Sequence, residues 1–594
     1  MISPSAGIPS PRGSGDSLES FRTPTGLSGA STHVAKVGSL STVDSSLELA
    51  VKCRTESSSI SAFSSPSSIF TKELQTEVEP EILRGVSLDV ALQGLGRHLQ
   101  PPDSGMFHVD PKNYMLSRRT TKFHAFLSHD WESSRWMKVI ALLIAFNAQA
   151  ASITTTVVSV LTGILCASGV LPTDFWTAIL PHAAFWIVLF FWQRIRSMIG
   201  FPVMVFLDKL CIAQHDEALK EQGVLGLAAF LHRSDQLTVL WSKRYFRRLW
   251  CSYELATFMK DADKHASIQF IPLKMGVLLS LLALVGLTAT TLFYVSLDLG
   301  HGHIEYPLTT GTLAAGAVFF FCPLLNYIGI KLMQELRELP HQVCNFRVQK
   351  AECFCCSRNH LHPDTGADIP CDRATVALML QQWFGRPGDL GEEYCRRFNR
   401  LVRHRLGPKI LRSVGGDALP LSYALYVVCC SNMPWLSTVI TQVAAGPPTA
   451  SGVGSMVWVL RHFLEWAQLC LAMLCMMRVS TLLWKVGSRT QRKGRRILAS
   501  FAIVVPTIAV GAITWWSFVL IYEATSQDSL LPGIPFLLVL ILTGYLYWPS
   551  SPRVSDLEEK GMEVEPDMIC SPGVSTSADG FRFRSHHAQP GEQQ

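Results

Sequence analysis

The sequence predicts an α/β domain with a parallel sheet, combined with about eight transmembrane helices. The first observation behind this is that short apolar runs alternate with patterns of helical spacing between 201 and 272. The second is the composition, because 48% of the 594 residues are hydrophobic and only 16% are charged, as in membrane proteins. The third is that Lys and Arg avoid every second connection between the long apolar runs.

The chain begins with a segment, 1–75, that is dominated by Ser, Thr, Pro and Gly. Such a segment buries too little apolar surface to offset the entropy of ordering, so we expect a disordered tail there and another over 551–594. Residues 76–147 are expected to hold a lead-in of short helical periodicity and then the first part of the α/β domain. In that part Phe123–Ser128 reads as a strand and Trp136–Phe146 as a helix.

The core of the α/β domain is expected over 201–272. The alternation there predicts three strands separated by two helices: Val203–Leu207, Glu217–Leu231, Leu237–Trp241, Trp250–Lys260 and Ser267–Pro272. In an open parallel sheet, ligands bind outside the carboxyl ends of the strands. We therefore expect chemistry in the loops after Leu207 and Trp241.

Uncharged apolar runs of the length that crosses a bilayer, about 20 residues, predict about eight helices in four hairpins: 148–171, 174–193, 274–297, 309–331, 418–443, 454–477, 497–521 and 533–548. The connections within hairpins lack Lys and Arg, whereas the connections between hairpins contain them. The positive-inside rule then predicts an integral multi-pass membrane protein with both termini and the α/β domain in the cytosol. The bilayer is thus an expected partner, and the small net charge of +6 argues against nucleic acid.

The predicted transmembrane hairpins interrupt the α/β domain. One hairpin region, 148–200, separates its first strand and helix from its core, and a second, 273–331, follows its last predicted strand. The cytosolic stretch 332–415 is expected to supply missing parts of the domain: a strand over 345–349 and helices over Cys371–Phe384 and Glu392–Leu406. Four further transmembrane helices are expected over 416–550.

Three segments carry motifs in a fixed order along the chain. They are an F-L-S box at Phe123–Ser128, the strand-like Val205–Asp208, and the spacing S-x-x-Y-x-x-x-x-W-C-x-x-E-L at Ser242–Leu255. These motifs resemble those of TIR (Toll/interleukin receptor-type) domains. The resemblance covers about 121–147 and 201–272, and it implies a flavodoxin-like parallel sheet that is discontinuous in this chain.

The resemblance also implies a reaction. In TIR domains that hydrolyse nucleotides, the Glu of the third motif is catalytic, so Glu254 is the expected catalytic residue and NAD the expected substrate, cleaved between nicotinamide and ribose. That bond breaks through an oxocarbenium-like transition state, which a nearby carboxylate stabilises. On this interpretation six residues contact NAD: Ser128, His129, Trp250, Tyr253, Lys209 and Lys243.

Two other functional classes stay open. Many TIR domains are adaptors without catalysis, and such a protein would act in signalling by associating with itself or with other TIR-like domains. A transporter or channel is the third class, because Arg461, His462 and Glu465 lie within an apolar run, and ionisable groups in a bilayer often mark a polar pathway. The basic run Lys485–Arg496 either binds anionic lipid headgroups or only sets the topology.

A cluster of soft ligands lies in the cytosolic stretch. Its members are Cys353, Cys355, Cys356, His360, His362 and Cys371. They are numerous enough for a tetrahedral zinc site, although the adjacent pair Cys355 and Cys356 matches no standard zinc finger. A loop of reduced thiols without a metal is the alternative.

Overall fold

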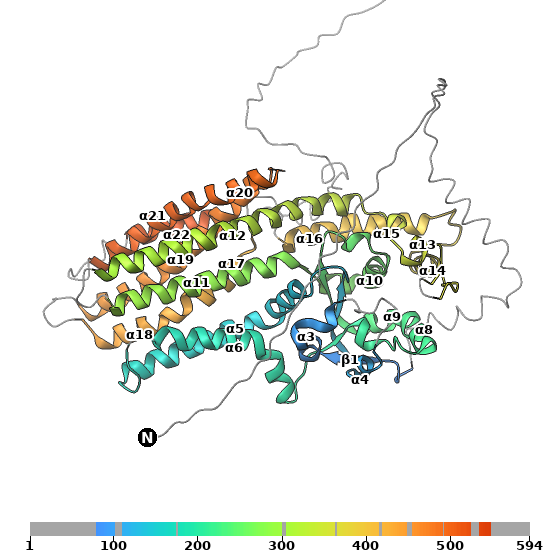
Figure 1. The fold of residues 1–594 in the computed structure, drawn as a ribbon, viewed down its shortest axis with the longest axis horizontal. Coiled ribbons are helices and arrows are strands. Elements are labelled where there is room, and N and C mark those ends of the chain that lie inside the picture. The colour runs from blue at the N-terminus through green and yellow to red at the C-terminus, as the bar shows by residue number, and fades with distance from the viewer. Residues whose placement is uncertain are drawn as a thin grey trace, which may run out of the picture. The chain divides into compact units, whose positions relative to one another are not determined.

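The computed structural model describes residues 79–100, 110–173, 176–299, 305–362, 365–414, 419–447, 454–490, 492–523 and 534–547. The predictions made for 1–75 and 551–594 lie outside these ranges. The described chain forms one mixed β-sheet with short helices around it, and a set of long helices that run alongside one another (Figure 1).

The sheet has six strands in the spatial order β2-β1-β4-β3-β5-β6. Their bounds are β1 Arg84–Ser87, β2 Arg118–Arg119, β3 Phe123–His129, β4 Met204–Phe206, β5 Ser234–Trp241 and β6 Ile268–Pro272. Strands β4, β3, β5 and β6 are parallel, whereas β1 pairs antiparallel with both β4 and β2. The four strands predicted within 121–147 and 201–272 are thus confirmed, but the prediction of a purely parallel sheet is wrong.

The antiparallel edge lies in the lead-in, where helical periodicity was expected. Part of this segment forms strand β1 instead of a helix. Its backbone passes close to the Phe123 ring, because a Cβ on Gly85 would lie 2.8 Å from a ring carbon. Only glycine allows this approach. The strand is short, and both of its pairs with β2 contain arginine, as in Arg84 opposite Arg119, so no apolar alternation indicates a strand there.

Short helices surround the sheet. They are α3 Leu88–Gly96, α4 Lys112–Met115, α7 Asp208–Cys211, α8 Glu217–Leu225, α9 Leu227–His232 and α10 Leu249–Met259. The helix predicted over Glu217–Leu231 is divided at Gly226, which ends α8 and precedes α9. The predicted helix at Trp250 is confirmed as α10, whose residues are almost all buried.

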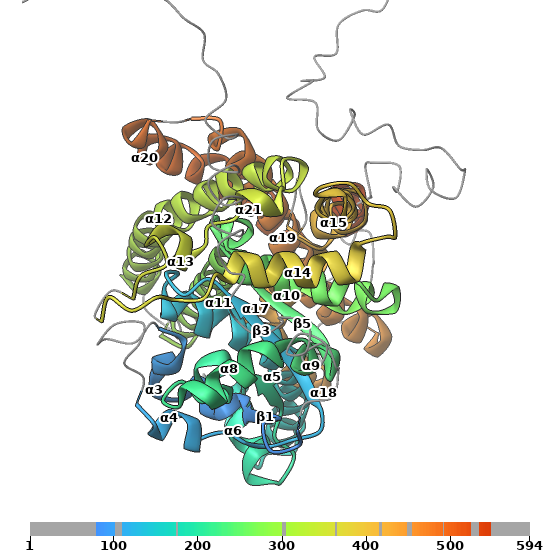
Figure 2. The same cartoon turned by 90° about the vertical axis from the view of Figure 1, so that its right-hand side faces the viewer.

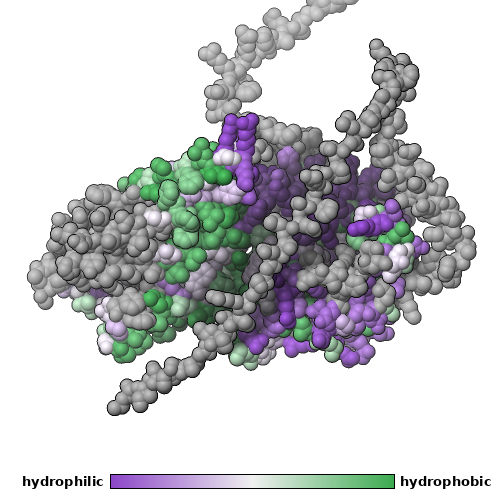
Figure 3. All heavy atoms as spheres, viewed as in Figure 1, coloured by the Kyte–Doolittle hydropathy of each residue, from purple (hydrophilic) through white to green (hydrophobic). Residues whose placement is uncertain are grey.

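The long helices are α5 Arg135–Ala167, α6 Trp176–Met198, α11 Leu273–Leu299, α12 Glu305–Cys344, α17 Leu421–Asn432, α18 Leu436–Ala445, α19 Ser455–Gly487, α20 Lys493–Ala502, α21 Val504–Glu523 and α22 Ile534–Tyr547. Four stretches of the described chain are long and apolar enough to cross a membrane: Arg135–Ala167, Leu421–Ala445, Ser455–Gly487 and Lys493–Gly511. Figure 3 shows apolar residues over the long helices and polar residues over the part with the sheet. Membrane insertion is therefore supported by four helices.

Helix α5 joins the sheet to the apolar helices without a break. The sequence predicts a soluble helix over Trp136–Phe146 and a separate transmembrane helix from 148, but the structure has one helix of 33 residues. At about 1.5 Å per residue this helix is about 50 Å long, which exceeds the hydrocarbon thickness of about 30 Å. Its first turns can therefore cover the sheet while the rest crosses a bilayer.

The two faces of α5 differ as expected for a lipid-exposed helix. Large apolar side chains at Ile153, Val157 and Leu161 are each more than half exposed. The opposite face is buried and carries small residues, among them Gly163, where an added Cβ would lie 2.8 Å from Ile440 of α18. Small residues inside and large apolar residues outside are typical of helix packing in lipid.

The stretch after α12 contains α13 Phe354–Ser357, α14 Asp372–Phe384, α15 Glu393–Leu401, a π-helical turn Val402–Leu406 and α16 Gly407–Val414. The predicted helices there are confirmed. The strand predicted over 345–349 is wrong, because α12 continues to Cys344 and a 3₁₀ turn follows at Val348–Lys350. The backbone N–H of Val348 donates to the Asn399 side chain, so it is not available to a strand partner.

Candidate functional site

The expected catalytic residue lies at the carboxyl edge of the parallel strands. Ser128, near the end of β3, donates a hydrogen bond from its hydroxyl to a carboxylate oxygen of Glu254 in α10. The Ser128 Oγ also lies 2.7 Å from the hydroxyl of the buried Tyr245. Three residues of the TIR-like motifs therefore meet at one point, although they are far apart in the sequence.

The environment of Glu254 disfavours its charged form. Burial raises the pKa of its carboxyl to about 8; the Ser128 hydrogen bond opposes this effect, the carboxylate of Asp208 adds to it, and Arg248 opposes it. The residue keeps partial exposure. A carboxyl group that titrates near neutral pH can change protonation state when a charged ligand binds beside it.

A group of buried charges lies next to this carboxyl. Asp130 follows β3, is 2% exposed and forms an ion pair with Arg248 at 3.6 Å. Asp208 follows β4 and accepts a hydrogen bond at 3.1 Å from the indole of Trp131. Burial raises the pKa of Asp208, and hydrogen bonds from Lys209 and Trp131 oppose the rise. The loops at the ends of neighbouring parallel strands thus form a polar site, as expected for such a sheet.

A buried lysine completes this group. Lys138 in α5 is fully buried, and its ammonium donates to the carbonyl oxygens of Leu99 at 2.9 Å and Trp131 at 3.3 Å. It therefore holds the loop after β3 against α5. Because α5 continues alongside the other apolar helices, this contact links the loop that carries Asp130 to that set of helices.

The two aromatic residues expected in the site lie on α10 and contact the segment after α12. The indole N–H of Trp250 donates to Asp372 at 3.2 Å, and the Tyr253 ring lies 5.4 Å from that of Trp383. Figure 2 shows α14 next to α10, above β3 and β5. Trp250 and Tyr253 are therefore packed against α14.

The remaining three expected NAD contacts take different positions. His129 is buried, its ring packs on Trp131 with the centroids 4.4 Å apart, and its Nε2 has no hydrogen-bond partner. Burial lowers its pKa well below the usual value, so the imidazole is neutral. Lys209 donates to the Gln100 carbonyl at 3.0 Å, and Lys243 pairs with Glu338 of α12 at 3.0 Å. The structure thus directs both ammonium groups to partners outside the Ser128–Glu254 pair.

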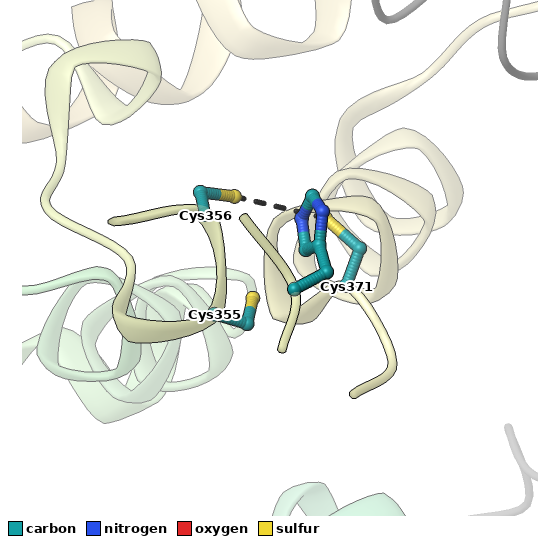
Figure 4. A group of neighbouring side chains, drawn as sticks. Cys355, Cys356 and Cys371 are labelled. Atoms are coloured by element: carbon teal, nitrogen blue, oxygen red, sulfur yellow. Dashed lines mark hydrogen bonds between the residues drawn. The ribbon is translucent and has the colours of Figure 1, made fainter. Parts of the chain in front are cut away.

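The predicted soft ligands converge in part. Atoms of Cys355, Cys356, His360 and Cys371 that can bind a metal all lie within 4.8 Å of one another. Figure 4 shows the thiols of Cys356 and Cys371 turned toward each other, with Cys355 close by. A set of three thiols and one imidazole is typical of tetrahedral metal sites. This part of the chain therefore forms a candidate metal centre.

The other two predicted ligands lie outside this group of four. Cys353 belongs to a second, overlapping group with Cys355 and Asp372. The Nδ1 of His362 accepts a hydrogen bond from the backbone of Thr365 at 3.2 Å. We therefore assign the centre to the four convergent residues.

The ionisable residues of the apolar helices are buried. Arg461, His462 and Glu465 of α19 are 2%, 4% and 7% exposed, and the His462 ring packs against that of Trp458 with the centroids 4.3 Å apart. One carboxylate oxygen of Glu465 has no hydrogen-bond partner. The predicted helical face with these groups is thus turned inward.

Sequence reasoning missed Asp130, Lys138, Asp208 and Arg248 as site residues. A signal for two of them exists, because Asp130 and Asp208 lie within two residues of the ends of the first two predicted parallel strands, where ligands bind. The other two have no comparable signal. Lys138 lies in a helix that reads as apolar, and Arg248 is one of several basic residues in Lys243–Arg248.

Comparison with protein-family models, curated proteins and solved structures gives no significant match to this chain. The chemistry of the site is therefore inferred from its own residues.

Proposed function

We propose that the chain is a membrane-anchored signalling protein whose cytosolic, TIR-like α/β domain hydrolyses NAD at the bond between nicotinamide and ribose. The observation that carries this proposal is the hydrogen bond between Ser128 and Glu254 at the carboxyl edge of the parallel strands. Both residues belong to motifs that resemble those of TIR domains. The two motif residues therefore meet at the edge of the sheet where ligands usually bind.

The order of the strands supports the TIR-like interpretation. Numbered along the chain, the parallel strands β4, β3, β5 and β6 lie in the order 2-1-3-4. This is the order of the first four strands in flavodoxin-like sheets. The antiparallel strands β1 and β2 are additions at the edge beyond β4, away from β5 and α10.

In the proposed reaction, the bond between C1′ of the ribose and N1 of nicotinamide breaks. Its electron pair leaves with the ring, which changes from a cation to neutral nicotinamide. Positive charge develops on the ribose, and water adds at C1′, giving ADP-ribose and a proton. The ionised Glu254 would stabilise the developing charge, and Ser128 would hold the carboxylate in place.

The pKa of about 8 at Glu254 suits a cationic substrate. In the free protein at pH 7 the carboxyl is mostly protonated. A nicotinamide ring with a positive charge favours the carboxylate, because opposite charges at close range lower a carboxyl pKa. Binding of NAD would therefore produce the form of Glu254 that the reaction needs.

Basic residues near the site are available to the diphosphate of NAD. Arg244 forms ion pairs with Glu132 and Glu352, and its side chain is 41% exposed. Lys243 is equally accessible and pairs with Glu338. Exposed ion pairs contribute little stability, about 0–1 kcal/mol, so a diphosphate can replace these carboxylates as the partner.

We propose zinc as the metal of the four-residue centre. The Nε2 of His360 is buried and has no hydrogen-bond partner, and it lies in a group with three thiols. A metal ion would satisfy that nitrogen. Zinc fits because three sulfurs and one nitrogen are among its usual structural ligand sets.

We further propose about eight membrane spans, with both termini and the sheet on the cytosolic side. The supporting observation is that the spans beyond the four apolar stretches coincide with helices α6, α11, α12 and α22. A glycosylation sequon inserted after Gly446 should be modified, and one inserted after Ser488 should not. The reverse pattern would overturn this topology.

Association with itself or with other TIR-like domains is the proposed means of regulation. Clustering on a membrane raises the effective concentration of such domains. A protein that clusters and signals without consuming NAD would instead be an adaptor. The substitution Glu254→Gln separates the two, because an adaptor does not need the carboxylate.

The proposed reaction is tested by its products. Full-length protein in liposomes, clustered through an antibody against an epitope tag, is incubated with NAD, and the products are separated by chromatography. The proposal predicts equal amounts of nicotinamide and ADP-ribose. Intact NAD, or release of AMP, would contradict it.

A second candidate function is transport through the helices, which the burial of Arg461 and Glu465 favours. It predicts a flux of protons or metal cations into liposomes that contain the protein and loss of this flux in Glu465→Gln. Liposomes with folded protein but without flux would exclude it under those conditions.

A further inference from the structure

The metal centre adjoins the N-terminus of α14, and α14 contacts α10, the helix that carries Glu254. We propose that zinc bound to Cys355, Cys356, His360 and Cys371 fastens residues 352–362 and α14 onto α10 and so keeps the Glu254 site assembled. The proposal rests on the proposed function only for the role of Glu254, since the fastening itself is a property of the fold.

The residues of the centre come from two ends of one loop. Cys355, Cys356 and His360 lie at and just after α13, whereas Cys371 lies at the N-cap of α14. A bound ion would close the loop between His360 and Cys371. Metal binding of this kind contributes directly to folding, because the site does not exist in the open chain.

The backbone conformation around His360 supports a metal site at this position. Asn359 and His360 have φ angles of 53° and 60°, in the left-handed region that non-glycine residues seldom adopt. The backbone N–H of His360 donates to the Cys355 carbonyl at 2.8 Å. This unusual turn places the imidazole in the group of thiols with its buried Nε2 unpaired, which is a strained arrangement without an ion.

Two hydrogen bonds connect this loop to α10, and a third connects the centre to the start of α14. The backbone of Asp372 donates to the Cys355 sulfur at 3.3 Å, and its side chain accepts from Trp250 at 3.2 Å. The backbone of Glu352 bonds to that of Leu249 at 3.2 Å, next to the start of α10. Trp250 and Glu254 are neighbours on one face of this helix, because they are four residues apart. Movement of the loop would therefore move the face of α10 that carries Glu254.

The end of α14 adds a further contact with the same helix. The Trp383 ring packs on Tyr253, and the ammonium of Lys260 lies 5.1 Å from the centre of the Trp383 ring. Helix α14 thus contacts α10 at both ends. If the loop opens at Cys371, the first turn of α14 loses its attachment, and we expect both helices to exchange amide protons faster.

The test measures zinc content and amide hydrogen exchange in the full-length protein in detergent. We expect about one zinc per chain. Removal of zinc with a chelator should speed deuterium uptake in peptides that cover Leu249–Met259 and Asp372–Phe384 by roughly tenfold or more. Peptides from β5 should change much less, and added zinc should restore the slow exchange.

Two variants sharpen the test. Cys371→Ser should lose zinc and show fast exchange in α10 even without chelator. Cys395→Ala, which removes a thiol outside the group of four in the same stretch, should keep the zinc and the slow exchange. If Cys371→Ser does not fold, chelation of the wild-type protein still decides the question.

Two results would overturn the proposal. One is a folded protein that binds no zinc, and the other is a protein whose α10 exchanges equally fast with and without zinc. Neither result depends on NAD turnover. A protein that shows zinc-dependent exchange but leaves NAD intact would refute the proposed reaction and leave the fastening role in place.

Discussion

The Ser128 hydroxyl donates a hydrogen bond to the Glu254 carboxylate and so joins β3 to α10 across 126 positions of the sequence. The bond lies at the carboxyl edge of the parallel strands. The apolar hairpin of α5 and α6 is inserted between the two residues in the chain. The pair therefore exists only because that hairpin returns the chain to the sheet beside β3, where β4 pairs.

Removal of this hydrogen bond should weaken the proposed activity. In Ser128→Ala the carboxylate loses a donor that favours its charged form, and a hydrogen bond to a charged group contributes about 1.5–3 kcal/mol. We expect kcat/KM for NAD at pH 7 to fall by about tenfold, with half-maximal activity moved upward by roughly one pH unit. Ser128→Thr keeps the hydroxyl and serves as the control; equal rates in all three proteins would contradict the role of Ser128.

The pH dependence of the wild-type protein follows from the same carboxyl. Glu254 must be ionised to stabilise a developing positive charge, and its pKa in the free protein is about 8. The value of kcat/KM reports the free protein, so we expect it to rise with pH and level off above about pH 8. If kcat/KM does not change between pH 6 and 9, the ionisation of Glu254 does not control the reaction rate.

The free energy of unfolding should fall as the pH rises, whereas kcat/KM should rise. The pKa of Glu254 is raised in the folded state, so the folded protein binds more protons than the unfolded chain between about pH 4.5 and 8. Its stabilising contribution is complete below the unfolded pKa and is lost as the pH rises through the folded pKa.

The substitution Glu254→Gln removes this titration and so tests whether the carboxyl destabilises the folded protein at high pH. We expect the variant to be more stable than wild type by about 1–3 kcal/mol at pH 9, after allowance for partial exposure. The advantage should shrink as the pH falls toward 5. Thermal unfolding in detergent, followed through intrinsic fluorescence at both pH values, measures the difference; a variant that is less stable at pH 9 would show that Glu254 is held as a carboxylate.

The ion pair between Asp130 and Arg248 is expected to be structural. Asp130 is 2% exposed, so Arg248→Met leaves a buried carboxylate beside the site without this partner. We expect a loss of about 2–4 kcal/mol. The second substitution Asp130→Asn should recover part of it, with a coupling of about 1–3 kcal/mol in the double-mutant cycle. Additive effects of the two substitutions would contradict the pairing.

The parallel strands could be predicted because each is a short apolar run next to a recognisable motif. Strand β3 contains the F-L-S box, and β5 precedes the basic segment that leads to α10. The apolar runs likewise coincide with helices. In both cases the pattern depends on local residues, since burial on one or both faces requires apolar side chains in a fixed period.

The rest of the fold depends on contacts between residues far apart in the sequence, which local sequence patterns do not predict. Strand β1 forms because Gly85 fits over Phe123. Helix α5 shows no signal where the part that covers the sheet ends, because apolar residues occur along its whole length. The convergence of His360 with three thiols depends on a turn with two positive φ angles, which the sequence Asn359-His360 does not announce.

In the candidate site, only the residues that belong to the sequence motifs could be predicted. Ser128 and Glu254 meet as the TIR-like motifs imply. Lys243 instead pairs with Glu338, because α12 extends from the apolar helices past the loop that carries this lysine. Contact with a long helix far away in the sequence thus sets the partner of this lysine.

The account depends most directly on the need for Glu254 in NAD cleavage. The decisive measurement is the rate of nicotinamide release from NAD by clustered full-length protein in liposomes, for wild type, Glu254→Gln and the control Glu221→Gln on α8. The account predicts a steady rate for wild type and the control, and a loss of about 100-fold or more in Glu254→Gln, as expected for removal of a group that stabilises transition-state charge. An equal rate in Glu254→Gln, or no release by folded and clustered wild-type protein, would contradict it.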